Sequence, residues 1–363
     1  MNIEWTNLPS LPPLKEGSIQ PGLAGPFAGL YANTLIVAGG ANFPDTMPWH
    51  GGKKSYHSEI YTLRLPANGE PWRVGHDGTE LPCRVAYGTS STVPAGVVCM
   101  GGEKENGITD QVYIISIAGS QLLITPLPSL PVPHSNAASA TVGSTVFIAG
   151  GVTPDGPSEG FWCLDTEAIS TGWKRLADLP LPLINSAMTA VAGSKPALWI
   201  MGGRTRADND DVSVIRPEVF SYSIADDNWK SEGVMTDGTD TVKLAAGTCA
   251  SLDKKHIAVF GGNDGAVFNR VEKILSEMAR ENDTALLSAK RKQYIDLQES
   301  HPGFSRDVII FDTETGKSYR AGEIPGPTQV TTIAVETPLG IIIPSGEIKP
   351  GVRTPEIRMV RIK

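Results

Sequence analysis

The fold of this chain is decided by a short apolar stretch that ends in two glycines, Val146-Phe147-Ile148-Ala149-Gly150-Gly151. Consecutive hydrophobic residues are typical of a buried strand, and glycines let the backbone turn where a Cβ would be strained. The same pattern recurs at residues 35–40, 97–102, 198–203 and 257–262 and, in a degenerate form, at 342–346. Six repeats of one unit therefore organise the sequence.

Each repeat contains further strand-like stretches around the one that ends in glycine. A stretch of small residues precedes it, as in 135–140, and a stretch with aromatic residues follows it, as in 218–222. A tryptophan opens the last stretch in several repeats, for example Trp173 and Trp229. Small residues suit strands that converge on a narrow axis, and aromatic residues fill the wedge where neighbouring sheets diverge. Four short strands per repeat predict an all-β fold, a six-bladed β-propeller.

The two ends of the chain predict how the ring of blades closes. Residues 4–9 contain the tryptophan and the Leu-Pro pair of an outermost strand, but no blade precedes them. Residues 356–362 form a third strand with no fourth strand after it. Pairing these two segments would complete blade six and remove the open edges of the ring. We therefore expect a single closed domain over residues 1–363, with its two ends side by side.

One segment departs from the repeat, between the fifth glycine pair and the strand at 307–311. Apolar residues within 271–280 and 284–299 follow a helical rather than an alternating spacing. We expect two helices there, in an insertion over about residues 266–304, between the second and third strands of blade five. Such an insertion would lie over one mouth of the channel, where long loops carry function. A surface excursion without function is the alternative.

The composition argues against several classes of protein. The net charge is -8 at pH 7 and no run of Lys or Arg forms a basic stripe, so we expect no nucleic-acid partner. Neither the 6 histidines nor the 4 cysteines show metal-ligand spacing, so we expect no metal and no cofactor. No apolar stretch approaches the roughly 18 residues of a membrane span. The first residues also lack the features of a signal peptide. Whether the protein forms a homodimer stays open.

Ligands of propellers usually meet the loops at one end of the axis, so polar residues after the glycine turns and near the innermost strands are the site candidates. The candidates after the glycine turns are Asn42, Glu103, Arg204, Asn263 and Glu347, and those near the innermost strands are Arg84, Tyr87, His134, Asn136 and Asn185. For each asparagine a solvated loop position or a backbone cap is the alternative. Glu103 could equally lie on the surface, and Arg84 would need an anion or a carboxylate partner.

Glu347 is the candidate for a catalytic base. It lies in Ser-Gly-Glu-Ile-Lys-Pro-Gly-Val-Arg-Thr at 345–354, directly after the sixth glycine turn, and Arg353 follows six positions later. Pro350 and Gly351 shape a stiff loop that could aim both side chains at one ligand.

These motifs resemble those of known families. The repeat is similar to the Kelch repeat over nearly the whole chain. Residues 345–354, the helical insertion after 260–263, and 84–88 followed by 100–103 resemble the N-acetylneuraminate epimerase (sialic acid mutarotase) family. The glutamate motif of that family lies near mid-chain, whereas here it lies near the C-terminal end, which resembles a cyclically permuted branch. A closed ring tolerates permutation if the new ends pair.

The resemblance implies an isomerase that works without a cofactor and interconverts the α and β anomers of N-acetylneuraminic acid or a related acidic sugar. The glutamate of the family motif is a proton acceptor, which maps onto Glu347. Tyr87, His134 or a water would donate a proton to the ring oxygen. The candidates for the substrate carboxylate are Arg84, Arg204 and Arg353. The candidates for the remaining sugar groups are Asn42, Asn136, Asn185, Asn263, Tyr87 and Glu103.

Other interpretations of the same pattern stay open. A non-catalytic Kelch-type module could bind a glycan or a protein across the channel mouth. A lyase or an oxidase could use the same scaffold, although an oxidase would need a copper or flavin site and no such motif is present. The secretion of the family suggests the periplasm, whereas the absence of a signal sequence leaves the cytoplasm open.

Overall fold

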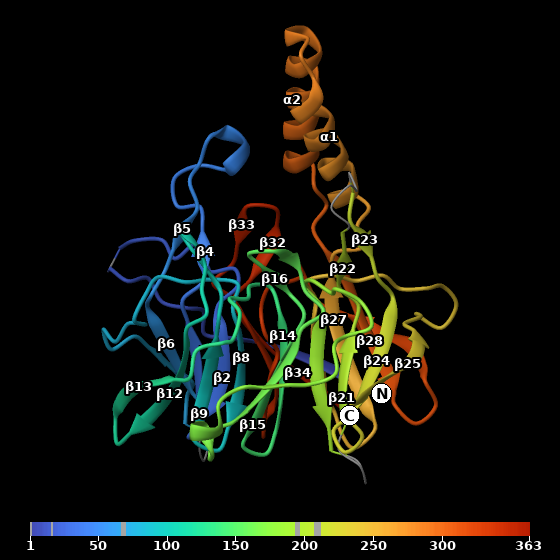
Figure 1. Cartoon of the computed structure of the whole chain (residues 1–363). Helices are drawn as coiled ribbons and strands as arrows, with labels where there is room; N and C mark the ends of the chain where they lie inside the picture. Colours follow the sequence, from blue (N-terminus) through green and yellow to red (C-terminus); the bar gives the residue numbers. More distant parts are fainter. Residues whose placement is uncertain (1, 16, 67–69, 193–196, 207–211) are drawn as a thin grey trace.

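The protein forms a six-bladed β-propeller (Figure 1). The computed structural model describes residues 2–15, 17–66, 70–192, 197–206 and 212–363. Each blade is a four-stranded antiparallel sheet, and the innermost strands of neighbouring blades contact one another around the axis. The all-β prediction with six blades is confirmed.

The strands of each blade follow in chain order from the axis outward, except for the last strand of blade six. Blades one and two consist of β2 (Phe27–Tyr31), β3 (Thr34–Ala38), β6 (Ile60–Arg64), β7 (Arg73–Gly75), and β8 (Thr89–Val93), β9 (Gly96–Met100), β12 (Val112–Ala118), β13 (Gln121–Leu127). Blades three and four consist of β14 (Ala138–Val142), β15 (Thr145–Ala149), β18 (Phe161–Asp165), β19 (Lys174–Arg175), and β20 (Ala187–Val191), β21 (Ala197–Met201), β24 (Glu218–Ser223), β25 (Asn228–Val234). Blades five and six consist of β26 (Thr248–Ser251), β27 (His256–Gly262), β28 (Ser305–Asp312), β29 (Lys317–Glu323), and β30 (Val335–Thr337), β31 (Gly340–Pro344), β34 (Ile357–Ile362), β1 (Ile3–Leu8).

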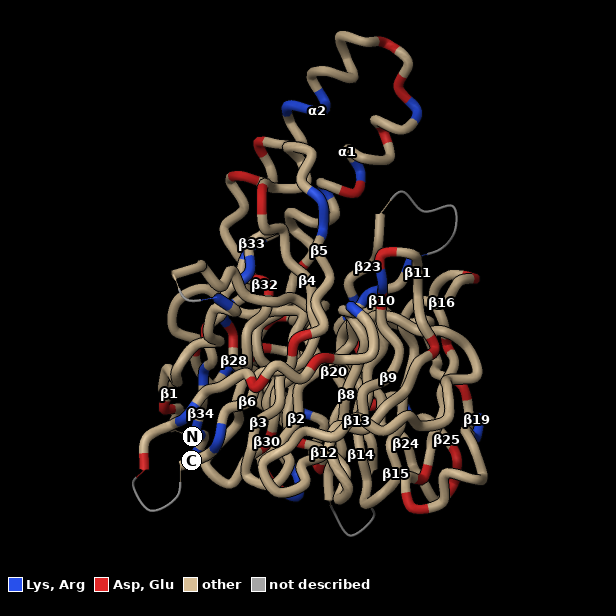
Figure 2. Tube along the Cα trace, turned by 90° about the vertical axis from the view of Figure 1, so that its left-hand side faces the viewer, with Lys and Arg blue, Asp and Glu red and all other residues tan. Residues whose placement is uncertain are grey.

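The closure of the ring follows the prediction from the two chain ends. Strand β1 pairs antiparallel with β34, from Ile3 opposite Ile362 to Leu8 opposite Ile357. The two termini lie side by side in both views of the chain (Figures 1 and 2). The Trp5 ring also packs edge-on against Phe260 of blade five, with centroids 6.1 Å apart. The N-terminal strand therefore completes blade six and ties it to its neighbour.

The second strand of each blade leads through its glycine turn into a short excursion at the same end of the ring. In five blades this excursion is a hairpin: β4 (Ala41–Asn42) with β5 (Ser55–Tyr56), β10 (Glu103–Lys104) with β11 (Gly107–Ile108), β16 (Val152–Thr153) with β17 (Gly156–Pro157), β22 (Arg204–Thr205) with β23 (Val214–Ile215), and β32 (Glu347–Lys349) with β33 (Val352–Arg353). Gly150 shows why the turn requires glycine: its φ is +66°, and a Cβ there would lie 2.4 Å from the carbonyl oxygen of Leu183 in the next blade.

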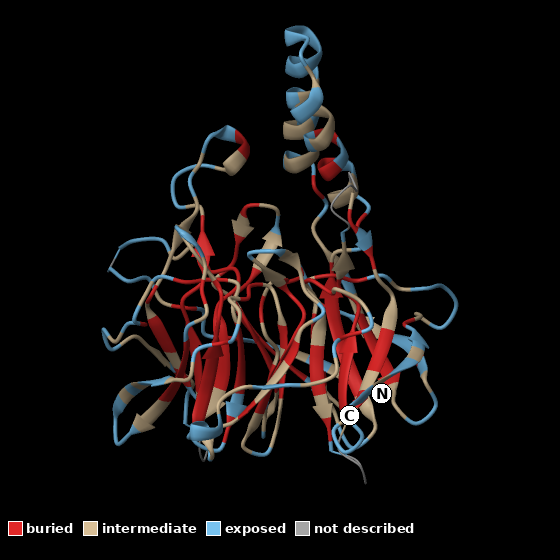
Figure 3. Cartoon of the chain, viewed as in Figure 1, coloured by how far each residue is buried: buried red, intermediate tan, exposed pale blue. Residues whose placement is uncertain are grey.

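In blade five the helices α1 (Phe268–Arg280) and α2 (Thr284–Glu299) take the place of the hairpin. They lie between β27 and β28, as predicted, and stand out from that end of the ring (Figure 1). Buried residues concentrate in the blades, whereas the outer part of the helical hairpin is exposed (Figure 3). Among the described residues, no helix is long and apolar enough to cross a membrane.

A closed ring of backbone hydrogen bonds joins the six blades at the end that carries the hairpins. One residue of each blade adopts a left-handed conformation, with φ between 50° and 63°. Each N–H donates to the carbonyl oxygen of the equivalent residue in the preceding blade, over 2.7 to 3.0 Å. The members of this ring are Gly25, Tyr87, Asn136, Asn185, Ala246 and Thr331. The ring fixes the blades relative to one another at the mouth of the axis.

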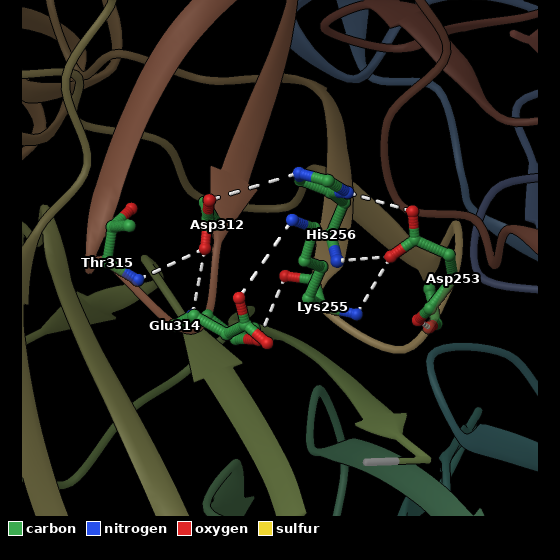
Figure 4. Close-up of polar contacts among 8 residues, drawn as sticks. Asp253, Lys255, His256, Asp312, Glu314 and Thr315 are labelled. Carbon is green, nitrogen blue, oxygen red and sulfur yellow. Dashed lines mark hydrogen bonds and ion pairs between the residues drawn. The ribbon is translucent and has the colours of Figure 1, made fainter.

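The opposite end of blade five is held by a polar cluster around His256, at the turns that join β26 to β27 and β28 to β29 (Figure 4). His256 Nδ1 lies 2.8 Å from a carboxylate oxygen of Asp253, and its Nε2 lies 3.9 Å from Asp312. The other oxygen of Asp253 accepts hydrogen bonds from the backbone N–H groups of Lys255 and His256. This cluster joins two turns and lies at the far end of β27 from the helices.

Candidate active site

The hairpin β32–β33 places Glu347 directly opposite Arg353. Arg353 Nη1 donates to Glu347 Oε1 over 2.8 Å, and the backbone N–H of Gly351 donates to the same oxygen over 2.9 Å. Glu347 Oε2 accepts no hydrogen bond from any described residue. One carboxylate oxygen is therefore fixed in place, and the other is available to a ligand.

Arg353 uses all three of its nitrogens on protein groups. Besides Glu347, Nε donates to the carbonyl oxygen of Ala41 and Nη2 to the hydroxyl of Tyr87, each over 3.3 Å. The guanidinium also lies 5.0 Å from the ring centroid of Phe43, and the residue is 9% exposed. A guanidinium held in this way orients its carboxylate partner. This geometry suits positioning of Glu347 better than capture of a substrate carboxylate.

Tyr87 lies between two positive charges. Its hydroxyl accepts from Arg353, and Lys54 Nζ lies 4.7 Å from its ring centroid. Burial raises the pKa of Tyr87, although Arg353 and Lys54 oppose this shift. The phenol therefore stays protonated at neutral pH.

Two cavities adjoin the hydrogen-bonded ring, one within the axial channel and one beside the hairpins of blades four and six and the insertion of blade five. The axial channel, of about 350 Å³, is lined by the innermost strands and includes Tyr87 and Asn136. The upper cavity, of about 270 Å³, lies between the ring, the hairpins and the helical insertion. The polar residues of the upper cavity are Asn185, Arg204, Asn263, Gln298, His301, Thr331 and Glu347, and its larger apolar residues are Ile215, Val267, Phe268, Val271, Phe304, Val330 and Pro350.

Arg204 supplies the guanidinium of the upper cavity. Its Nη1 donates to the Ser213 hydroxyl over 3.0 Å, and its guanidinium carbon lies 5.5 Å from the ring centroid of Phe268. Burial lowers the pKa of Arg204, and the nearby Glu272 carboxylate opposes this shift. Glu272 is itself buried on α1 and accepts from the backbone N–H and the hydroxyl of Ser213. The insertion thus holds the hairpin β22–β23 that carries Arg204.

The structure brings several of the predicted residues together. Glu347, Arg204, Asn185 and Asn263 line the upper cavity, and Arg353 and Tyr87 are linked to Glu347 by hydrogen bonds. Asn185 Nδ2 donates to Asn136 Oδ1 over 3.0 Å within the axial ring, and Asn263 Oδ1 accepts from the backbone N–H of Gly265 over 2.9 Å.

Other predicted residues lie outside the upper cavity. Asn42 is buried, donates to the carbonyl oxygen of Gly22 and faces a ring nitrogen of His57, so both ends of its amide are engaged within the protein. Glu103 accepts hydrogen bonds from Tyr56 and Lys54 of the neighbouring hairpin, β4–β5. Its carboxylate thus serves this contact between blades one and two.

Arg84 and His134 are also placed away from Glu347. Arg84 is exposed and lines neither cavity. His134 is buried and lines neither cavity, and its Nδ1 lies 2.7 Å from the carbonyl oxygen of Val132. Burial lowers the pKa of His134. These positions favour a packing role for His134 and a solvated one for Arg84.

His301 and Phe268 also line the upper cavity, although no pattern in the sequence singles them out. His301 lies at the end of the insertion, just after α2, but no sequence motif relates it to Glu347, and only the fold brings the two to one cavity. The position of the insertion after a glycine turn is the one signal that could have indicated them. Within the described part of the chain, no group of three or more His, Cys, Asp or Glu residues could hold a metal ion.

Fold and site together define a six-bladed β-propeller with a carboxylate held by an arginine at the mouth of its axis. A sequence model described as N-acetylneuraminate epimerase matches residues 1–124 and 127–363. The chain therefore belongs to the N-acetylneuraminate epimerase family. The order of its blades relative to other members stays a prediction.

Individual relatives are similar over part of their length. The N-acetylneuraminate epimerase of Vibrio vulnificus is 29% identical over 238 residues, which cover 64% of this chain and 58% of the relative. That of Vibrio cholerae is 26% identical over 235 residues, with the same two shares. That of Haemophilus influenzae is 38% identical over 132 residues, or 34% of this chain and 33% of the relative. The matches thus span less than two thirds of the length of these curated relatives.

Proposed function

We propose that this protein is a mutarotase that interconverts the α and β anomers of N-acetylneuraminate or a closely related acidic sugar. The observation that carries the proposal is the carboxylate of Glu347, which has one oxygen fixed by Arg353 and Gly351 and lines a cavity that also contains Arg204. The names of the relatives, all N-acetylneuraminate epimerases, support the same substrate class.

Mutarotation opens the sugar ring and closes it on the other face of the anomeric carbon. Glu347 would accept the proton of the anomeric hydroxyl, whose oxygen becomes the carbonyl oxygen as the bond from the anomeric carbon to the ring oxygen breaks. The electron pair of that bond goes to the ring oxygen, which then takes up a proton. After rotation about one carbon–carbon bond, the same steps in reverse give the other anomer. The reaction moves only protons and breaks and re-forms one C–O bond, so the proposal invokes no cofactor.

The upper cavity offers groups for the rest of an acidic N-acyl sugar. Arg204 is the guanidinium that lines it, and a guanidinium pairs well with a carboxylate. Asn185 and Asn263 could bind hydroxyl groups. The apolar wall around Phe268 suits the methyl of an N-acetyl group.

The test is to dissolve the pure β anomer of N-acetylneuraminate and to follow anomer-specific NMR signals with and without protein. We expect the wild type to speed equilibration and Glu347→Gln to lose the acceleration by about 10²- to 10⁴-fold, because the base is gone. Glu314→Gln, an exposed carboxylate between β28 and β29, is the matched control and should equal the wild type. Binding of the sugar by the wild type without any acceleration would instead favour a non-catalytic glycan-binding module.

A further inference from the structure

His301 occupies a position in the upper cavity that the proposed reaction has not used. It lies between the end of α2 and the start of β28, is 5% exposed and lines the same cavity as Glu347 and Arg204. The turn that follows it lies against the Glu347 hairpin: a Cβ on Gly303 would be 3.5 Å from the carbonyl oxygen of Ile348. The fold thus brings the imidazole to the side of the cavity formed by β32.

The hydrogen bonds of His301 define which nitrogen carries its proton. The backbone N–H of Gly303 donates to His301 Nδ1 over 3.0 Å, so Nδ1 is an acceptor and bears no hydrogen. Burial lowers the pKa of His301, Lys349 adds to this shift, and Asp264 opposes it. At neutral pH the ring is therefore uncharged, and its one N–H is on Nε2.

No described residue accepts a hydrogen bond from His301 Nε2. An N–H that borders the upper cavity and has no acceptor among the described residues is suited to a ligand oxygen. The ring is also fixed in orientation, because Phe304 packs against it with centroids 5.4 Å apart and Gly303 holds the other nitrogen. His301 therefore presents a preorganised neutral donor.

We infer that His301 is a second catalytic residue, whose Nε2–H donates a hydrogen bond to the ring oxygen of the sugar; this inference rests on the proposed mutarotase function. When Glu347 takes the anomeric proton and the ring C–O bond breaks, negative charge develops on the ring oxygen, and the fixed N–H stabilises it. The ring oxygen then receives the proton from the Glu347 carboxylic acid, which is close because both reacting oxygens are bonded to the same carbon. The imidazole stays neutral throughout, as a hydrogen-bond donor rather than a proton source.

Two amide substitutions separate this role from a purely structural one. In His301→Gln the side-chain amide nitrogen can occupy the place of Nε2, so the donor to the cavity is retained. In His301→Asn the amide oxygen can occupy the place of Nδ1, so the bond from Gly303 is retained and the donor is lost. The control for loss of an imidazole is His76→Gln. His76 lines neither cavity, and its Nδ1 is hydrogen-bonded to the carbonyl oxygen of Ile60.

We expect His301→Asn to lower kcat for anomer interconversion by about 10²-fold, the effect of removing one charge-stabilising donor, with the thermal midpoint unchanged. His301→Gln should retain at least tenfold more kcat than His301→Asn, and His76→Gln should equal the wild type. A wild-type kcat in His301→Asn, or an equal loss of kcat in His301→Asn and His301→Gln, would overturn the catalytic role of His301.

A readout that does not depend on activity comes from the ¹⁵N NMR shifts of histidine-labelled wild type at pH 7. We expect His301 to show a protonated Nε2 and a bare Nδ1, with the Nε2 shift changing when N-acetylneuraminate is added. The opposite tautomer, or no response to the sugar, overturns the inference even if Glu347-dependent mutarotation is observed. If the wild type does not speed mutarotation at all, the proposed function fails, and the catalytic role of His301 fails with it.

Discussion

Arg353 is the residue on which the geometry of Glu347 depends. Replacing it with methionine keeps most of its apolar bulk but leaves the half-buried Glu347 without its partner and removes donors to Ala41 and Tyr87. We expect Arg353→Met to reduce the free energy of unfolding by roughly 3 kcal/mol, the effect of leaving one partner of a buried pair unpaired. Mutarotation should fall by at least tenfold. Urea unfolding and the NMR anomer assay measure the two effects.

The control for this substitution is Arg175→Met, which breaks the exposed pair of Arg175 with Asp178. Exposed ion pairs contribute little to stability, so the unfolding midpoint should not change. An Arg353→Met variant as stable and as active as Arg175→Met would contradict the positioning role of Arg353.

Gly351 is required both for its backbone conformation and for the space it leaves. Its φ is +75°, and a Cβ there would lie 2.9 Å from Met47 Sδ and 3.3 Å from Trp49. Gly143 provides a matched control, because its φ is +61° but a Cβ would meet nothing within 4 Å. We expect Gly143→Ala to cost about 1 kcal/mol of unfolding free energy. Gly351→Ala should cost more and should also slow mutarotation, because its N–H holds Glu347.

Equal unfolding midpoints for Gly351→Ala and Gly143→Ala, measured by urea titration, would show that the contacts of Gly351 with the loop of blade one contribute nothing. A normal mutarotation rate in Gly351→Ala would show that its N–H is not needed to hold the carboxylate.

At the residue scale, the sequence identifies the glutamate and arginine of one short loop but cannot tell which arginine faces a ligand. Glu347 and Arg353 are six positions apart in a hairpin, so their contact follows from local structure. The placement of Arg204 and His301 beside Glu347 depends on contacts between three blades, which no local spacing encodes. Asn42 is polar and follows a glycine turn like the true cavity residues, yet it serves a backbone contact.

At the scale of elements, His57 anchors the segment that joins the hairpin β4–β5 of blade one to strand β6. One ring nitrogen of His57 lies 3.0 Å from Asn42 Oδ1, and the other lies 3.3 Å from Glu59 Oε2. The side-chain hydrogen bond with His57 lowers the pKa of Glu59 from 4.5 to about 2, against the opposing effect of burial. A carboxyl group whose pKa is lowered by folding stabilises the protein above its unfolded-state pKa and loses this contribution as pH falls through the folded-state value.

We therefore expect Glu59→Gln to be less stable than the wild type at pH 6 by roughly 2 kcal/mol. The difference should shrink as pH falls from about 4.5 and should vanish near pH 2. Urea titrations of both proteins between pH 6 and pH 2.5 measure this, with Glu314→Gln as a control that should follow the wild type. A difference between Glu59→Gln and wild type that stays constant with pH would contradict the assigned coupling.

Helices and strands can be predicted from the sequence where the spacing of apolar residues extends over many positions, and poorly where the element has only two or three residues. The helices of the insertion follow apolar spacing over 13 and 16 residues and are found at nearly the expected bounds. The hairpins after the glycine turns were not expected, because strands of two or three residues show no periodicity. The left-handed ring residues were also missed, although asparagine tolerates this conformation and occupies two of the six positions.

At the scale of the whole molecule, the ring is closed by β1, whose side chains join two cores. Leu8 packs in the core between blades six and one, and Trp5 packs in the core between blades five and six. A chain that starts at Ser10 lacks these side chains and leaves the edge of β34 unpaired. Losing the buried Leu8, the partly buried Ile3 and Trp5 and the pairing with β34 costs several kcal/mol together, so we expect the thermal midpoint to fall by roughly 10 °C.

The matching deletion removes the helical insertion by joining Asp264 to Gly303 through a short Gly/Ser linker. The outer part of the insertion is exposed (Figure 3), so the blades should keep a thermal midpoint within a few degrees of the wild type. Mutarotation should be lost, because Phe268 and His301 leave the upper cavity. Circular dichroism melts and the NMR assay thus separate closure of the ring from construction of the site. A peptide of residues 2–14 contains β1 and should raise the thermal midpoint of the chain that starts at Ser10. If the peptide has no effect, or if the truncated chain is as stable as the wild type, β1 does not close the ring in solution.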